Sequence, residues 1–394
     1  MPTRCEIILI LILAGCVVLA GCGGGSSNPP TTAATSNLYV ATQSNTVVTN
    51  LPINLDDGTL SGAGPKVATG SSPISMAITP GNTPAGTLAF VVNNQCVNGN
   101  TNCNSISSYT VNADGTLAAL AGSTGTGTNP VAVTVNPASS LVFVANQGSD
   151  SISVFTIGTD GSLTSAPNSP FPTFADPVAL AVSPNGKYLY VANSVLGKVS
   201  VYTIGSTGSL SLLPNAPFTG QSASIPSGVA VSADGKFIYV SNFGSNNISV
   251  FNACIAVSTI CPIADGSLQE VPFSPFALGV GMGTGPGPIL IDGTGTYLFV
   301  LDLSSNQISE FRINVTILDA LTTTTNLVPA IPETTPTGVG ATALAIHPTG
   351  RWLYTANYKA STITVYYLDT LTGVLTPSAT PFATSGQPAA LAVR

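Results

Sequence analysis

The stretch Pro177-Val-Ala-Leu-Ala-Val-Ser-Pro-Asn-Gly-Lys-Tyr-Leu-Tyr-Val-Ala-Asn193 decides the fold, because the chain repeats it along nearly its whole length. The next copy is Pro226-Ser-Gly-Val-Ala-Val-Ser-Ala-Asp-Gly-Lys-Phe-Ile-Tyr-Val-Ser-Asn242. Further copies begin at Pro73, Pro130, Pro286 and Ala341, and a half-copy begins at Pro388, so the starts lie 47 to 60 residues apart. A repeat of this length made of short strands is typical of a β-propeller blade.

Each copy predicts four antiparallel strands. A short apolar strand such as 178–182 is followed by a Gly-containing turn and an aromatic, β-branched strand such as 188–192. A third, alternating strand follows, as in 199–204. Asp-Gly pairs then predict a hairpin turn into the fourth strand, and we expect type I′ turns with positive φ at both central residues. These pairs are Asp57-Gly58, Asp114-Gly115, Asp160-Gly161 and Asp265-Gly266.

The two ends of the repeat region complement each other. Asn37-Leu-Tyr-Val-Ala41 reads as a second strand without a first, and Pro388-Ala-Ala-Leu-Ala-Val393 reads as a first strand with nothing after it. Together they complete one blade, which closes the ring and removes an exposed sheet edge. The sequence therefore predicts an all-β fold over residues 37–394. We expect a seven-bladed β-propeller of four-stranded antiparallel blades, with its ring closed by pairing of the N- and C-terminal strands.

The N-terminal segment predicts export. Residues 7–20 are almost wholly apolar after Arg4, a run too short for a comfortable membrane span but suited to a signal peptide. The run ends in Leu19-Ala-Gly-Cys22, which looks like a bacterial lipoprotein signal; Cys16 ends an earlier sequence of the same form. We expect a signal peptide over 1–21, a lipidated Cys22 and a flexible tether over 22–36. The expected location is the bacterial cell envelope, outside the cytoplasm, although a plain secreted protein or a single-span anchor stays open.

Four further cysteines form two pairs, each seven residues apart, in segments that lengthen their blades. Local pairing, Cys96 with Cys103 and Cys254 with Cys261, is one of three connectivities, and we expect it because the segments lie in different blades. Such disulfides suit an oxidising compartment. The alternative is a metal held by four thiolates, but the spacing is C-x6-C rather than C-x2-C, so we expect no metal site.

Composition argues against several partners. Only 6% of the residues are charged, the net charge is −7, and no basic stripe exists, so nucleic acid and anionic membrane surfaces are poor partners. The single histidine, His347, excludes a zinc site built on several histidines. It occupies the turn position held by Ser183 and Ser232, so we interpret it as a turn residue rather than a base. We expect no cofactor, a monomer, and membrane contact only through the lipid.

One polar position recurs at the end of every second strand. The residues are Thr42, Asn93, Asn146, Asn193, Asn242, Asp302 and Asn357. We expect them on the crossover face, where the chain passes from one blade to the next. Asn can serve there structurally, because its side-chain amide caps turns. The functional alternative is a polar collar at the channel mouth that binds a sugar or a cation, with the five Asn residues and Asp302 as binding candidates. Residues that depart from the repeat in one blade only are the stronger site candidates, namely Phe243, Asp302 and Tyr358-Lys359.

The repeated turn-and-strand stretches at 183–193, 232–242 and 347–357 carry a family resemblance. Together with the Asp-Gly-Ser/Thr-Leu turns, they make the chain resemble seven-bladed propellers of the lactonase and YVTN-repeat type from about residue 37 onward. The resemblance implies either a sugar-lactone hydrolase, as in relatives of 6-phosphogluconolactonase, or an exported propeller without known chemistry.

Two functions follow as hypotheses. The first is a surface-anchored binding or interaction module for a carbohydrate or protein ligand; an envelope structural protein is a further option. The alternative is a lactonase-like hydrolase with its site at the crossover-face mouth of the channel. Lactone hydrolysis needs a base and a donor for the oxyanion. The catalytic candidates are Asp302 or Asp176 as base and Lys359 as donor, with Asp150 and Lys198 as the other charges expected nearby. The scattered cations predict that phosphorylated lactones are not substrates.

Overall fold

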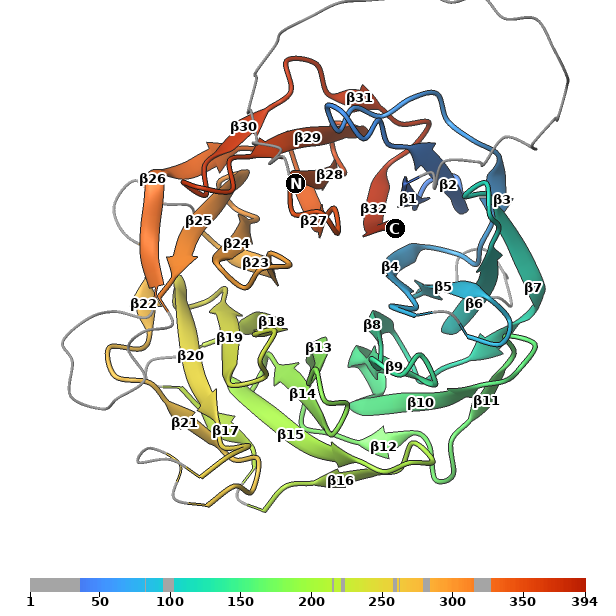
Figure 1. The fold of residues 1–394 in the computed structure, drawn as a ribbon. Coiled ribbons are helices and arrows are strands. Elements are labelled where there is room, and N and C mark those ends of the chain that lie inside the picture. The colour runs from blue at the N-terminus through green and yellow to red at the C-terminus, as the bar shows by residue number, and fades with distance from the viewer. Residues whose placement is uncertain are drawn as a thin grey trace, which may run out of the picture. The chain divides into compact units, whose positions relative to one another are not determined.

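The computed structural model describes residues 36–81, 83–94, 103–214, 216–220, 224–257, 261, 263–278, 284–314 and 327–394. Within the compact unit Ala34–Arg394, seven antiparallel sheets follow one another around a ring (Figure 1). The predicted seven-bladed all-β propeller is therefore confirmed. The expected signal peptide 1–21, Cys16, Cys22 and nearly all of the tether 22–36 lie outside the described residues, as does Cys96.

Every blade begins with an innermost strand beside the channel. These strands are β4 (Pro73–Ile78), β8 (Pro130–Val135), β13 (Pro177–Val182), β18 (Pro226–Val231), β23 (Pro286–Ile291), β27 (Ala341–Ile346) and β32 (Pro388–Val393). The second strands are β1 (Asn37–Thr42), β5 (Thr87–Asn93), β9 (Leu141–Asn146), β14 (Tyr188–Asn193), β19 (Phe237–Asn242), β24 (Tyr297–Asp302) and β28 (Trp352–Asn357). We number the blades 1 to 7 in the chain order of these second strands.

The third strands are β2 (Val47–Pro52), β6 (Ser105–Val111), β10 (Ser151–Ile157), β15 (Lys198–Ile204), β20 (Asn247–Ala253), β25 (Gln307–Ile313) and β29 (Thr362–Leu368). The outer strand is a single piece in three blades, namely β3 (Lys66–Ala68), β7 (Leu117–Gly125) and β26 (Leu327–Pro336).

In blades 3, 4, 5 and 7 the outer strand is broken into two short pieces. The pieces are β11 (Leu163–Ser165) with β12 (Phe171–Pro172), β16 (Leu210–Leu212) with β17 (Phe218–Thr219), β21 (Leu268–Glu270) with β22 (Phe276–Ala277), and β30 (Leu375–Pro377) with β31 (Phe382–Ala383). Both pieces of each pair bond to the same third strand. Three of the breaks contain two prolines, and the break of blade 7 contains Pro381 alone; proline cannot donate a backbone hydrogen bond to the neighbouring strand. The fourth strand of the sequence prediction is thus real but interrupted.

The ring closes as predicted. The C-terminal strand β32 pairs antiparallel with the N-terminal β1, in a register that sets Leu38 against Val393 and Val40 against Leu391. In Figure 1 this places the last strand, in red, beside the first, in blue. Leu391 is 7% exposed and packs in one apolar cluster with Leu38 and Val40. Closure therefore rests on both strand pairing and burial of apolar side chains.

Apolar clusters lie between adjacent blades, and the innermost strands show why small and large residues alternate. In β13, Leu180 and Val182 pack toward blade 3, whereas Ala179 and Ala181 pack toward blade 5. Large side chains therefore fill one boundary while small ones let the next blade approach. The largest fully buried side chains, among them Trp352 and Tyr190, lie in these boundaries.

The Asp-Gly turns differ from the prediction. Gly58, Gly115, Gly161 and Gly266 have φ between 73° and 82°, but the preceding Asp residues do not have positive φ. The type I′ prediction was wrong, since that turn needs positive φ at both central residues. Each Asp instead uses its carboxylate locally. Asp160, for example, accepts hydrogen bonds from the backbone N–H and the hydroxyl of Ser162. The aspartate side chain thus forms an Asx turn by bonding to the residue two positions later, and the Asp itself does not need a positive φ.

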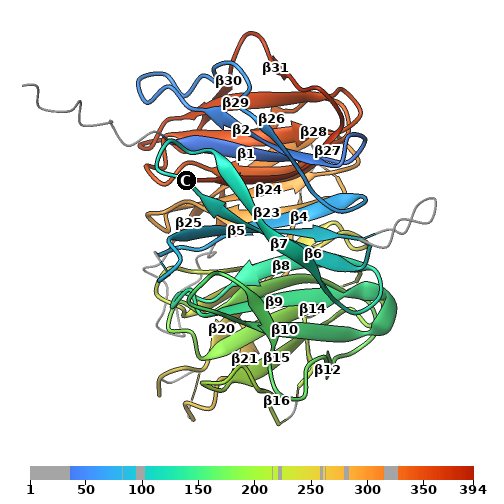
Figure 2. The same cartoon turned by 90° about the vertical axis from the view of Figure 1, so that its right-hand side faces the viewer.

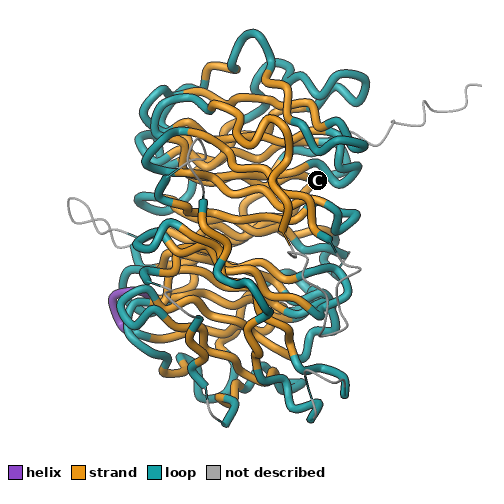
Figure 3. The backbone as a smooth tube through the Cα atoms, turned by 90° about the vertical axis from the view of Figure 1, so that its left-hand side faces the viewer, coloured by secondary structure: helices purple, strands orange, loops and turns teal. Residues whose placement is uncertain are grey.

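The ring has two faces, which carry different connections between the strands. The crossover face carries the links between blades and the turns from second to third strand. The turn face carries the turns from first to second and from third to fourth strand. Figure 2 shows blades 1 to 4 edge-on, and Figure 3 shows the 3-10 helix η1 (Gln147–Ser149) on one side and the C-terminus on the other. The helix marks the crossover face, because it follows a second strand. No helix among the described residues has the length and apolar character to cross a membrane.

One predicted disulfide is confirmed. Cys254 and Cys261 are bonded, with 5.2 Å between their Cα atoms. Both sulfur-bearing side chains are buried in the extension between the third and outer strands of blade 5. Cys103 is also disulfide-bonded, and the partner expected for it, Cys96, is not among the described residues.

Candidate functional site

The central channel is lined mainly by small and apolar side chains of the innermost strands. A cavity of about 440 Å³ runs between the innermost strands. Its polar side chains are the hydroxyls of Ser75, Ser227 and Thr342, and no charged side chain among the described residues lines it. Lactone hydrolysis needs a base, so a catalytic site belongs at a mouth of the channel rather than inside it.

We call the residue that ends each second strand the latch residue. The five latch Asn residues and Asp302 are each 0% exposed. Each Asn amide donates to a hydroxyl two positions inside the third strand of its own blade. The pairs are Asn93–Ser107 (3.0 Å), Asn146–Ser153 (2.9 Å), Asn193–Ser200 (2.8 Å), Asn242–Ser249 (3.0 Å) and Asn357–Thr364 (2.8 Å).

Most latch residues also hold the incoming crossover. The Oδ1 atom of Asn93 accepts from Thr69 Oγ1 at 2.8 Å, and that of Asn193 accepts from Thr173 Oγ1 at 3.2 Å. The same oxygen of Asn357 accepts from Gly338 N at 3.1 Å. Their burial and their hydrogen bonds within the blade favour the structural alternative for these residues, and only Asn242 Oδ1 among the five Asn oxygens is buried without a partner among the described residues. Their binding role stays a prediction, with no exposed amide atom to carry it.

Asp302 occupies the latch position of blade 6 as a carboxylate. Ser309 Oγ donates to its Oδ2 at 2.7 Å, while Oδ1 is buried without a hydrogen-bond partner among the described residues. Burial raises the pKa of Asp302 to about 7, partly offset by the bonds from Ser309. Water cannot reach this fully buried carboxylate in the structure, so Asp302 is a poor candidate for the base.

The structure does not bring the three predicted catalytic residues together. Asp176 precedes blade 4 and Lys359 follows the second strand of blade 7, so two blades separate them. Lys359 is exposed and lies beside Gly340. The ion pair found among the described residues joins Lys236 to Asp234, on the turn face, and it involves none of the three.

A different arrangement lies around the channel mouth on the crossover face. We call it the rim, and it contains the residue after each second strand and the residue before each innermost strand. The first set is Gln43, Asn94, Gln147, Ser194, Phe243, Leu303 and Tyr358, and the second is Ser72, Asn129, Asp176, Ile225, Gly285, Gly340 and Gln387. In every blade, the backbone N–H of the first residue donates to the backbone carbonyl of the second at 2.8 to 3.1 Å.

Side-chain amides connect the polar part of the rim in one direction. Asn94 Nδ2 donates to Asn129 Oδ1 at 3.0 Å, and Asn129 Nδ2 donates to Gln147 Oε1 at 2.8 Å. These bonds orient the Gln147 amide, because its oxygen is already engaged. Gln147 Nε2 is therefore the free donor at the end of the series, with no partner among the described residues.

The boundary between blades 3 and 4 differs from the two boundaries that precede it in the chain. At the two preceding boundaries, the residue after the second strand bonds to the residue before the next innermost strand: Gln43 to Ser72 at 2.6 Å, and Asn94 to Asn129. The equivalent pair at the next boundary is Gln147 and Asp176, and no hydrogen bond joins these two side chains. This boundary therefore holds a neutral hydrogen-bond donor and a carboxylate. Each has a side-chain atom that forms no hydrogen bond with another described residue.

Asp176 is firmly positioned. Its own backbone N–H donates to Asp150 Oδ1 at 2.8 Å, and Ser194 Oγ donates to its Oδ2. Its φ of 64° lies in the left-handed region, as does that of Asp150 at 45°. Such backbone positions are unusual for residues other than Gly, and here the side-chain bonds fix them. An oriented carboxylate and a neutral donor at the same boundary can activate water and stabilise an oxyanion.

Sequence reasoning found Asp176 but missed Gln147 and Ser194. The available signal was position, since both residues directly follow a latch Asn. The rim is apolar in blades 5 and 6, where Ile225, Phe243 and Leu303 are 49%, 39% and 36% exposed. Of the departures predicted as site candidates, Phe243 belongs to this apolar part. Tyr358 donates to Gln43 Oε1 at 2.6 Å in the polar part.

His347 on the turn face resembles a nucleophile–base pair without being one. Its Nε2 lies 2.7 Å from Ser36 Oγ, and Ser36 in turn donates to the backbone oxygen of Arg394. However, its Nδ1 accepts the backbone N–H of Thr349, so the ring proton is on Nε2 and points to Ser36. The imidazole cannot take the Ser36 proton in this arrangement. Burial also lowers the pKa of His347. The prediction of a turn residue is confirmed.

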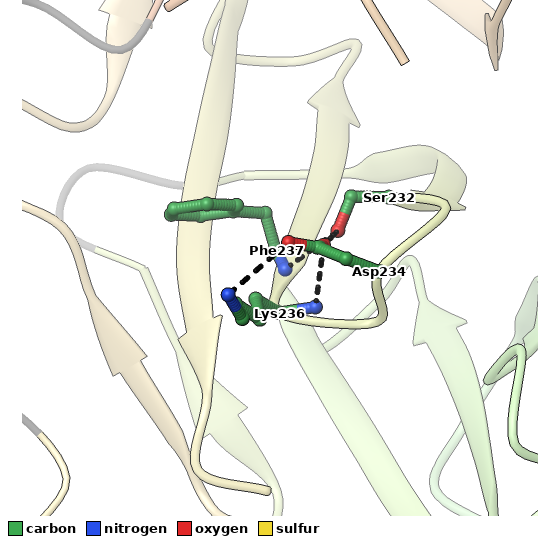
Figure 4. A network of polar contacts seen from close by, with 4 residues as sticks. All are labelled: Ser232, Asp234, Lys236 and Phe237. Atoms are coloured by element: carbon green, nitrogen blue, oxygen red, sulfur yellow. Dashed lines mark hydrogen bonds and ion pairs between the residues drawn. The ribbon is translucent and has the colours of Figure 1, made fainter. Parts of the chain in front are cut away.

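Another cavity, of about 640 Å³, lies on the turn face between blades 5 and 6. Asp234 and Arg312 are among its lining residues. Figure 4 shows that Asp234 is engaged within its own turn: it accepts from Ser232 Oγ at 2.6 Å and Lys236 N at 3.0 Å, and pairs with Lys236 Nζ at 3.6 Å. Burial alone would raise the pKa of Asp234, but these hydrogen bonds and the Lys236 charge hold it below the usual value. An ionised, saturated turn carboxylate is a poor base.

Known structures share this architecture. The periplasmic gluconolactonase of Pseudomonas aeruginosa is 21% identical with a TM-score of 0.75, covering 91% of this chain and 99% of that chain. A Bacteroides fragilis protein named as a candidate 6-phosphogluconolactonase is 21% identical with a TM-score of 0.73, covering 93% and 100%. A Bacteroides uniformis protein named in the same way is 19% identical with a TM-score of 0.76, covering 92% and 100%. At these identities the likeness shows the fold alone.

Sequence comparison goes further than structural likeness. No match to this chain is found among the curated proteins. The family described as "Lactonase, 7-bladed beta-propeller" matches residues 37–169, 176–317 and 259–393, which together span nearly the whole propeller. The chain therefore belongs to the lactonase family of seven-bladed β-propellers.

Proposed function

We propose that the protein is a lactone hydrolase whose site is the boundary between blades 3 and 4 at the crossover-face mouth of the channel. Family membership supports a hydrolase better than the binding module that the sequence first favoured. The observation that carries the location is the oriented pair of a free amide donor, Gln147 Nε2, and a fixed carboxylate, Asp176.

The chemistry follows from these two groups. Asp176 takes a proton from a water molecule, whose oxygen attacks the lactone carbonyl carbon. Negative charge develops on the carbonyl oxygen, and Gln147 Nε2 donates a hydrogen bond to it. When the tetrahedral intermediate collapses, the ring C–O bond breaks. The departing alkoxide takes the proton from Asp176, which returns the carboxylate and gives an open hydroxy acid. Ser194 and Asp150 act only by holding Asp176 in place.

The site favours an uncharged lactone. No Lys or Arg forms an ion pair with Asp150 or Asp176 among the described residues. A phosphate group wants several cations or the free N–H groups of a helix start. The overall charge of −7 also repels an anionic substrate. We therefore propose a neutral sugar lactone as the substrate and keep the prediction that phosphorylated lactones are not hydrolysed.

Turnover of glucono-1,5-lactone, corrected for spontaneous hydrolysis, tests this proposal. Asp176→Asn should lower kcat by about 100-fold or more, because the general base is lost. Gln147→Leu should lower it by about 10- to 100-fold by removing the oxyanion donor. Asp234→Asn, on the turn face, is the matched control and should keep wild-type turnover.

Two results would contradict the proposal. One is wild-type protein that adds nothing to the spontaneous rate. The other is Asp176→Asn protein that keeps wild-type turnover. Equal turnover of 6-phosphogluconolactone and the neutral lactone would instead overturn the substrate class and leave the site standing.

Envelope anchoring is a separate proposal. It rests on the sequence of residues 1–36, and the disulfide between Cys254 and Cys261 supports an oxidising compartment. We propose a monomer that is lipidated on Cys22 and has no nucleic-acid partner. Mass spectrometry of the mature protein should find lipid in the wild type and none in Cys22→Ala. Lipid retained by Cys22→Ala but lost in Cys16→Ala would make the earlier cysteine the anchor.

A further inference from the structure

Blade 1 lacks the Asn or Asp side chain that the other six blades carry at the latch position. Its latch position is Thr42, whose hydroxyl donates to the backbone oxygen of Val47 at 3.3 Å. In blade 4, by comparison, Asn193 reaches both Ser200 in the third strand and Thr173 in the crossover. A threonine is too short to make both contacts, so this end of blade 1 is left open.

A cavity of about 310 Å³ lies where the missing side chain would be, between blades 7 and 1. Thr42, Thr49 and Thr384 all line it. Thr49 holds the third-strand position of Ser200, and Thr384 holds the crossover position of Thr173. The two hydroxyls that would hold an amide therefore face a space instead.

The polar wall has unused hydrogen-bonding capacity. Thr49 is 6% exposed, and its hydroxyl bonds to no other described residue. Thr384 Oγ1 turns to the backbone oxygen of Gly386 at 2.6 Å, rather than to a latch. The Thr49 hydroxyl lies at the cavity wall, where it can donate a hydrogen bond to a ligand with an acceptor oxygen.

The remaining wall is apolar with one cation. Val40, Leu51 and Phe382 supply hydrocarbon surface, and Lys66 lines the cavity from the outer strand β3. Lys66 is exposed and forms no ion pair with another described residue. An ammonium beside apolar surface and free hydroxyls suits an anion that carries a hydrocarbon tail.

Blade 6 shows that a carboxylate fits this position. Asp302 replaces the latch Asn there, and its Oδ2 accepts from Ser309, the equivalent of Thr49, at 2.7 Å. We propose that the cavity between blades 7 and 1 binds a small carboxylic acid with an apolar tail. Its carboxylate takes the latch position and accepts from Thr49, Lys66 balances its charge, and its tail lies on Val40, Leu51 and Phe382. This site is separate from the proposed hydrolytic one.

Binding of sodium octanoate to the purified protein, measured by calorimetry, tests the site. Octanoate should bind the wild type, and 1-octanol should bind about tenfold more weakly because it cannot pair with Lys66. Lys66→Gln should weaken octanoate binding by about tenfold and leave 1-octanol unchanged. Lys359→Gln, a cation on the same face outside the cavity, is the matched control and should bind octanoate as the wild type does.

The most specific variant restores the latch. Thr42→Asn should abolish octanoate binding, because the new amide occupies the position of the ligand carboxylate. Ala63→Leu, which fills the cavity from another wall, should do the same and covers the case in which Thr42→Asn does not fold. Undiminished binding to either folded variant, or no binding to the wild type at millimolar octanoate, would overturn the proposal. Equal affinity for octanoate and 1-octanol would overturn the assignment of a carboxylate.

Discussion

Blade 4 and blade 1 are built from the same unit but are completed differently. Blade 4 comes from one continuous stretch, and Asn193 ties its crossover to its third strand. Blade 1 takes its innermost strand from the C-terminus, has Thr42 at the latch position, and keeps a cavity there. Yet both blades show the same second-to-third strand register. The repeat thus supplies two separable things, namely strand pairing that builds the blade and an amide that seals its crossover end.

Removing residues 388–394 should have the largest effect. The change strips β32 from β1, exposes a strand edge, and takes Leu391 out of its cluster with Leu38 and Val40. We expect a loss of about 5 kcal/mol or more in the free energy of unfolding, comparable with the whole stability of many domains. Urea denaturation followed by fluorescence of Trp352, the single tryptophan, measures it.

Removal of Arg394 alone is the control for that experiment, because it leaves β32 whole. This shorter deletion should cost far less than the full one. A truncated protein with the wild-type urea midpoint would show that closure does not depend on the last strand.

The next largest effect on stability should come from replacing a latch residue by alanine. Asn193→Ala removes the partner of Ser200 and Thr173 and leaves buried polar groups unpaired, so we expect a loss of about 2–4 kcal/mol. Thr42→Ala removes only a weak bond to Val47 and should cost about 1 kcal/mol or less. Urea denaturation measures both losses. Equal losses in the two variants would show that the latch residue of blade 4 stabilises the protein no more than that of blade 1.

The repeat made the architecture predictable. Seven strand patterns at near-constant spacing, two complementary ends and two cysteine pairs are all properties of linear sequence. Local chemistry was harder, since the Asp-Gly turns use an aspartate side chain where a second positive φ was expected. Positions within one repeat unit, such as His347 in its turn, could still be assigned by comparing the copies.

The candidate site depends on contacts between blades, which the repeat does not encode. Gln147 and Asp176 stand out as candidates only because the equivalent side chains at two other boundaries are hydrogen-bonded to each other. Glu310 shows the same limit. It takes the place of Val201 and Val250 in the third strand, is 0% exposed, and accepts from Thr335 and from Leu375 N at 3.1 Å. Burial raises its pKa to about 7. One unusual residue among seven copies gives no sign of where its partners lie.

The smallest predicted effect concerns blade 6, where the latch is the carboxylate Asp302 rather than an amide. Its folded-state pKa of about 7 is above the ordinary aspartate pKa of 3.8. The unfolded chain therefore loses this proton first, and stability falls as pH rises from about 4 through 7. Asp302→Asn removes this loss, so we expect the variant to be more stable than the wild type by about 2 kcal/mol at pH 8 and by less at pH 5.

Urea midpoints at several pH values should be compared between the wild type and Asp302→Asn. Glu310, whose pKa is also raised, is present in both proteins, so its effect on stability cancels in the difference. Asn242→Asp is the converse variant. It places a carboxylate in the same buried position of blade 5, opposite the Ser249 hydroxyl, and should create a new loss of stability toward pH 8. If the curves of wild type and Asp302→Asn run parallel from pH 5 to 8, the Asp302 carboxylate reaches solvent. The latch position of blade 6 would then be open, like that of blade 1, rather than sealed, like that of blade 4.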